Sequence, residues 1–112
     1  MKTIDRGTLQ QSLNSSQKPI LIEALPEKYF LDGHLPGALH LPHDAVRTLA
    51  ASLLPDKAAP VVVYCASKTC QNSHIAAAQL VSLGYGDVAV YAGGKQDWVE
   101  AGLPLEREAA TV

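Results

Sequence analysis

Four short runs of mostly apolar residues stand out along the chain. They cover residues 19–25, 38–41, 61–64 and 87–92, and turn-forming or charged residues lie between them. Within these runs most apolar residues follow one another instead of alternating with polar ones, which is typical of strands buried on both faces of a parallel sheet. The pattern therefore predicts a strand at each position.

Amphipathic segments separate the predicted strands. The residues after Asp44 are predicted to form a helix, because apolar side chains recur at i, i+3, i+4 and i+7: Val46, Leu49, Ala50 and Leu53. A longer helix is predicted over residues 72–83, where Gly84 ends it. Its buried stripe would consist of Ala76, Leu80 and Leu83, flanked by Ala77 and Val81.

Two shorter helices are predicted towards the ends of the chain. Leu9 and Leu13 lie one helical turn apart after Asp5 and Thr8, either of which is a suitable N-cap. The second short helix covers residues 96–101. Strands that alternate with helices predict the α/β class, in which helices cover both faces of a parallel sheet.

Length and charge limit the classes of function. The 112 residues suit one domain, and a hydrophobic fraction of 47% is enough for a core. The formal net charge of -2 argues against nucleic acid or an anionic membrane as the main partner, although a small anionic ligand remains possible. No stretch approaches the roughly 20 apolar residues of a membrane span, and the N-terminus has no long apolar run. We therefore expect a cytoplasmic protein whose cysteines are thiols.

The only two cysteines of the chain, Cys65 and Cys70, lie between the strand at 61–64 and the helix at 72–83. Buried cysteines often only fill space, and that explanation stays open for Cys70. A metal site is disfavoured, because no second pair of ligands accompanies the two thiols. Sites in parallel α/β folds form beyond the carboxyl ends of strands, where Cys65 is expected. Cys65 is therefore the candidate nucleophile.

The loop after Cys65 has the composition of an anion cradle. Its backbone N–H groups and the start of the following helix would create a positive field, and we expect that field to lower the pKa of Cys65. The residues of this candidate binding loop are Ala66, Ser67, Lys68, Thr69, Cys70 and Gln71. Lys68 is its only cation, and it either attracts an anion or is simply an exposed lysine.

Four segments, in this order, resemble the rhodanese family. They are GHLPGALHLP at residues 33–42, VVVYC with its loop and helix at residues 61–83, LGYGDVAVYAGG at residues 83–94, and W-x3-G-L-P at residues 98–104. The resemblance implies one rhodanese domain over residues 1–112, a three-layer fold with a parallel five-stranded sheet flanked by helices on both faces. It implies a catalytic cysteine, matched by Cys65, that carries sulfane sulfur as a persulfide. It also implies a structural role for His34.

The resemblance implies no metal and no organic cofactor. The expected donors are small anionic sulfur compounds such as thiosulfate, or a persulfide. The expected acceptors are cyanide, a thiol or a partner protein's cysteine.

Three departures from the family pattern keep alternatives open. The acidic Glu23 lacks the arginine that often follows it in the family. Second, the segment between Cys65 and Gly84 is longer than the family's common sulfurtransferase pattern implies. Enlarged loops in the family go with larger substrates, including phosphate in the related phosphatases, but the closing arginine of those phosphatases is absent, which disfavours phosphate chemistry. Third, Cys70 could resolve a persulfide or sulfenic acid on Cys65 as a disulfide. A thiol–disulfide switch through both cysteines and a non-catalytic binding or regulatory module are therefore the alternatives to sulfur transfer.

Overall fold

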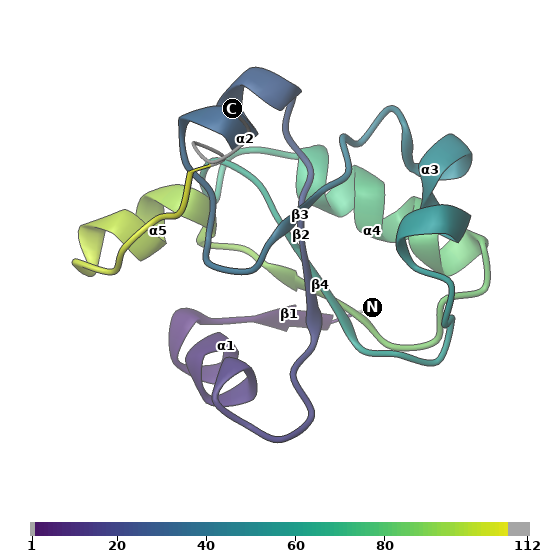
Figure 1. Cartoon of the computed structure of the whole chain (residues 1–112), viewed down its shortest axis with the longest axis horizontal. Coiled ribbons are helices and arrows are strands. Elements are labelled where there is room, and N and C mark those ends of the chain that lie inside the picture. The colour runs from purple at the N-terminus through teal and green to yellow at the C-terminus, as the bar shows by residue number, and fades with distance from the viewer. Residues whose placement is uncertain (1, 108–112) are drawn as a thin grey trace.

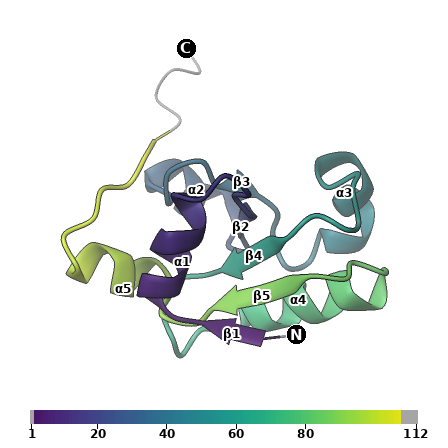
Figure 2. The same cartoon turned by 90° about the horizontal axis from the view of Figure 1, so that it is seen from below.

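The fold is built around a five-stranded parallel sheet with the strand order β1-β5-β4-β2-β3. The structure, a computed structural model, describes residues 2–107. The strands are β1 (Lys2–Ile4), β2 (Ile20–Glu23), β3 (Leu39–His40), β4 (Val61–Tyr64) and β5 (Val88–Tyr91). Figure 2 shows β1 beside β5 at one edge of the sheet. The central strand is thus β4, whose residues are all buried.

Helices cover both faces of this sheet. They are α1 (Arg6–Leu13), α2 (Glu27–Asp32), α3 (Val46–Leu53), α4 (Asn72–Ser82) and α5 (Gly94–Glu100). In Figure 1, α3 and α4 lie on one side of the central strands, and α1 and α5 lie on the other. The predicted α/β class with a flanked five-stranded sheet is therefore confirmed.

Side chains of the central strands alternate between two cores. Val61 and Val63 pack with α3 and α4, whereas Val62 and Tyr64 pack with α1, α2 and α5. Both sets are apolar because both faces of β4 are covered, which explains the continuous apolar run in the sequence.

Two elements were absent from the sequence-based prediction. β1 has only three residues, two of them exposed, and it is held by pairing with β5. α2 has six residues, of which only Phe30 is buried, so it is too short for a periodic pattern. Two side chains are more exposed than the helical patterns predicted. Leu49, on the apolar face of its helix, is 39% exposed, and Val81, beside the buried stripe, is 44% exposed.

The helix termini follow from local chemistry. Asp5 is the N-cap of α1, and its carboxylate accepts a hydrogen bond of 2.8 Å from the backbone N–H of Thr8. Gly84 has a φ of 99° just after α4, as expected for a residue that ends a helix. Across residues 2–107, none of the helices combines the length and the apolar character needed to cross a membrane.

Candidate functional site

Cys65 is the first residue after β4, at the carboxyl end of the central strand. The segment Ala66–Gln71 follows it and leads directly into α4. A backbone hydrogen bond of 3.1 Å from Cys70 to the carbonyl of Ser67 closes a turn within this loop. The loop therefore curls back, so that residues on either side of it come close together.

The Cys65 side chain is enclosed, and the residue is only 1% exposed. Its sulfur lies 3.3 Å from the hydroxyl of Ser73 and donates to the carbonyl of Cys70 at 3.4 Å. Burial raises the pKa of the Cys65 thiol, and the interaction with Cys70 raises it further. The hydroxyl and the N–H of Ser73 lower this pKa, but by less. The expectation that the loop would lower the pKa of Cys65 was wrong.

Cys70 shows the opposite behaviour. Its burial raises the pKa, but three favourable interactions outweigh that effect: those from the Cys65 thiol and from the backbone N–H groups of Ala66 and Asn72. The pKa of Cys70 is consequently below its ordinary value. The backbone donors that were expected to serve Cys65 thus reach the sulfur of Cys70 instead.

The other loop residues are placed around this pair. Ala66, Lys68 and Thr69 are exposed, and the Ser67 and Thr69 hydroxyls lie 3.1 Å apart. Gln71 precedes α4 and accepts a backbone hydrogen bond from Ile75. Ser73 lies in the first turn of α4, and sequence reasoning did not identify it as a contact of Cys65.

Lys68 is exposed, and residues of α5 lie beside it. It lines a pocket of about 240 Å³ together with residues of α5 and the glycine before it: Gly93, Gln96, Asp97 and Glu100. Two of these are acidic, and their field opposes the attraction of an anion to Lys68.

The start of α5 is bound to the loop that follows Cys65. The backbone N–H of Lys95 donates to the carbonyl of Cys65, and that of Gln96 donates to the carbonyl of Ala66, both at 2.8 Å. Gly94 permits this approach, because a Cβ there would lie 2.6 Å from the Cys65 carbonyl oxygen and its φ is 69°. The loop is therefore fixed both by its own turn and by the backbone of α5.

A buried ion pair lies at the carboxyl end of the neighbouring strand β2. Glu23 is fully buried, and its Oε1 lies 3.1 Å from the ammonium of Lys95. The same oxygen accepts a hydrogen bond of 2.7 Å from Tyr64, whose hydroxyl accepts one from the backbone N–H of Leu35. Burial raises the pKa of the Tyr64 phenol, and the charge of Glu23 adds to this. The arginine that often follows this acidic residue in the family is absent, and Lys95 of α5 supplies a cation to Glu23 instead.

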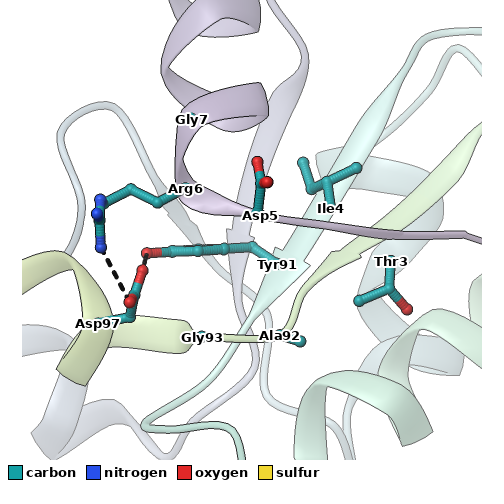
Figure 3. A pocket seen from close by; sticks show the side chains of 9 residues that line it. All are labelled: Thr3, Ile4, Asp5, Arg6, Gly7, Tyr91, Ala92, Gly93 and Asp97. Carbon is teal, nitrogen blue, oxygen red and sulfur yellow. Dashed lines mark hydrogen bonds and ion pairs between the residues drawn. The ribbon is translucent and has the colours of Figure 1, made fainter.

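Another pocket, of about 570 Å³, opens at the carboxyl ends of β1 and β5 and does not include Cys65. Figure 3 shows the Asp97 carboxylate between Arg6 and Tyr91. Arg6 donates to it at 3.0 Å and Tyr91 at 2.6 Å. Burial, followed by the hydrogen bond to Asp97, raises the pKa of Tyr91. Because this arginine is already paired, the pocket is a poor anion site.

His34 has the structural role that was expected of it. Its ring stacks on Phe30 with a centroid separation of 3.9 Å, and its Nδ1 donates to the Phe30 carbonyl. Its backbone forms an antiparallel bridge with Glu106. Within residues 2–107, no three side chains of the types that hold metals are grouped as a metal site.

We expect limiting iodoacetamide at neutral pH to alkylate Cys70 at least about ten times faster than Cys65, because the thiolate is the reactive species. Cys70 is partly exposed with a lowered pKa, whereas Cys65 is buried with a raised one. Peptide mapping against time and pH measures both rates. The Cys70 rate should persist to lower pH than that of an ordinary thiol. Equal rates at both cysteines would contradict this prediction.

Comparisons with known proteins bear on the family and the fold of the chain. The profile of the family described as "Rhodanese-like domain" matches residues 6–101. A curated sulfurtransferase from Allochromatium vinosum is 31% identical over 102 residues, covering 91% of this chain and 92% of that protein.

Two solved structures share the fold. The thiosulfate sulfurtransferase from Pseudomonas aeruginosa has a TM-score of 0.84 at 26% identity; the match covers 96% of this chain but only 20% of that one. The human single-domain sulfurtransferase TSTD1 has a TM-score of 0.78 at 22% identity, over 89% of this chain and 96% of that one.

Proposed function

The chain belongs to the rhodanese-like domain family, and we propose that it is a sulfurtransferase that carries sulfane sulfur as a persulfide on Cys65. The observation that carries the proposal is the position of Cys65. Its sulfur lies at the carboxyl end of the central strand, against the Ser73 hydroxyl and inside a curled loop.

The first half-reaction requires the Cys65 thiolate. Because burial raises the pKa of the Cys65 thiol, its proton must be lost before the attack. Loss of this proton to water or to the anionic donor produces the nucleophile without a histidine base. The Ser73 hydroxyl and N–H then stabilise the new thiolate, since both lower the pKa of Cys65.

The thiolate attacks the outer sulfur of thiosulfate or of a persulfide. A new S–S bond forms on Cys65, and sulfite or the donor's thiolate leaves with the electron pair of the broken bond. In the second half-reaction cyanide, a thiol or a protein cysteine takes the outer sulfur. Neither half-reaction needs a metal or an organic cofactor.

Rapid-quench mass spectrometry tests the proposal. Reduced protein is mixed with thiosulfate or with glutathione persulfide, and the early products are mapped to peptides. We expect one added sulfur on Cys65, together with an equivalent amount of released sulfite or glutathione. If neither donor is consumed and no mass is gained, sulfur transfer is rejected and a non-catalytic binding module remains.

A thiol–disulfide switch is the second candidate, and the contact between the two cysteines favours it. It predicts that hydrogen peroxide alone links Cys65 to Cys70 and removes both thiols without any sulfur donor. In the rapid-quench experiment, loss of two hydrogens before any donor is consumed would favour this candidate.

A further inference from the structure

The Cys70 sulfur lies where backbone N–H groups of the curled loop converge. The curled loop directs the N–H groups of Ala66 and Asn72 at the Cys70 sulfur, and the Cys65 thiol interacts with that sulfur as well. Such convergent N–H groups are the usual means by which a loop binds an anion. The chain therefore places its own second sulfur in this cradle, in a residue whose carbonyl contacts the candidate nucleophile.

The two cysteines differ in accessibility. Cys65 is 1% exposed, whereas Cys70 is partly exposed at the rim of the loop. The carbonyl of Cys70 lies 3.4 Å from the Cys65 sulfur, so the backbone of Cys70 contacts the candidate nucleophile. Because Cys70 belongs to the same loop, its attack on Cys65 needs no second molecule to enter the site.

We propose that Cys70 discharges the Cys65 persulfide by attacking the Cys65 sulfur, which forms a Cys65–Cys70 disulfide and releases hydrosulfide. This inference rests on the proposed function, because it begins from the persulfide. It assigns the protein a further activity, the reductive release of sulfide from sulfane sulfur. Each turnover then needs a dithiol reductant to restore the two thiols.

The step balances without an external oxidant. The Cys70 thiol first gives its proton to the outer sulfur of the persulfide. The Cys70 thiolate then attacks the inner sulfur, the persulfide S–S bond breaks, and the outer sulfur leaves as HS⁻ with the bonding electron pair. The sulfane sulfur is thus reduced to sulfide, while the two cysteines end as a disulfide.

The position of the Cys70 sulfur favours attack on the inner sulfur. It interacts with the Cys65 sulfur itself and is held there by backbone donors that belong to the loop. Since these donors are already engaged, they cannot hold the outer sulfur of the persulfide in the same place. Intramolecular attack also has the advantage of high effective concentration.

An anaerobic single-turnover experiment tests the inference. Reduced wild-type protein and Cys70→Ser receive one equivalent of thiosulfate, or of glutathione persulfide, with no other thiol present. For the wild type we expect one sulfide per protein, a loss of two hydrogens, and a Cys65–Cys70 link in the peptide map. Protein incubated without donor should stay reduced, which excludes adventitious oxidation.

The Cys70→Ser variant separates the two proposals. We expect it to keep the added sulfur on Cys65 and to release no sulfide, and Cys70→Ala should behave in the same way. Wild-type protein that keeps a stable persulfide, on Cys65 or on Cys70, would overturn the inference but leave sulfur transfer standing. Sulfide release by Cys70→Ser equal to that of the wild type would overturn it as well. Failure of both proteins to consume either donor would reject sulfur transfer itself, and the inference with it.

Discussion

Cys65→Ser is expected to lower the rate of sulfite release from thiosulfate by about a thousandfold or more, the scale on which removal of a nucleophile acts. A serine hydroxyl is not ionised near neutral pH and does not replace a thiolate in attack on sulfur. The measurement is sulfite release under single-turnover conditions.

The fold should survive this substitution. The serine hydroxyl can use the partners that now surround the Cys65 sulfur, the Ser73 hydroxyl and the Cys70 carbonyl. The free energy of unfolding is therefore expected to change by no more than about 1–2 kcal/mol. Denaturant unfolding of both proteins checks that the loss of rate is not a loss of structure.

The matched variant is Cys70→Ser, which removes the other thiol of the same loop. It should still release sulfite, because the attacking sulfur belongs to Cys65. In the opposite outcome, Cys65→Ser would release sulfite within about tenfold of the wild-type rate while Cys70→Ser releases none. That result would show that Cys70, and not Cys65, accepts the sulfur.

Strands whose side chains are buried on both faces of the sheet could be predicted from the sequence. β4 was predicted with its observed bounds, because covering both faces of a strand requires apolar residues at every position. β1 was missed for the opposite reason: it lies at the sheet edge, and only pairing with β5 makes it a strand. An edge strand with exposed side chains leaves no apolar run to read.

The candidate site could be predicted only where its residues are neighbours in the sequence. The strand, Cys65 and the curled loop lie along one stretch of chain, so their order alone places the cysteine. The relative acidity of the two thiols was not readable, because it depends on which sulfur the N–H groups of Ala66 and Asn72 reach. The partner of Glu23 was not readable either, because Lys95 is distant in sequence and meets it only through the fold.

That ion pair leads to the second large effect. Lys95→Met is expected to lower the free energy of unfolding by about 3 kcal/mol, near the low end of the range for breaking a buried pair. Glu23 would keep a buried charge without its cation, since it is 0% exposed while Lys95 is 17% exposed. For a chain of this size the loss corresponds to a fall in Tm of roughly 10–15 °C.

The control is Lys28→Met on α2, another lysine that lies near Tyr29 but makes no ion pair among those described within residues 2–107. Its free energy of unfolding should change by no more than about 0.5 kcal/mol. If Lys95→Met were as stable as this control, the ion pair would not be what stabilises the end of β2.

Two further variants show that charge compensation, rather than packing of the lysine stem, is responsible. Lys95→Arg should retain most of the stability, because a guanidinium can also reach Oε2 of Glu23, which has no hydrogen-bond partner among the described residues. Glu23→Gln combined with Lys95→Met should recover part of the loss, since Tyr64 can still donate to the amide oxygen and no buried charge remains. A double variant as unstable as the sum of its single changes would instead assign the effect to packing. The arginine that the chain lacks after Glu23 would then have no electrostatic substitute in α5.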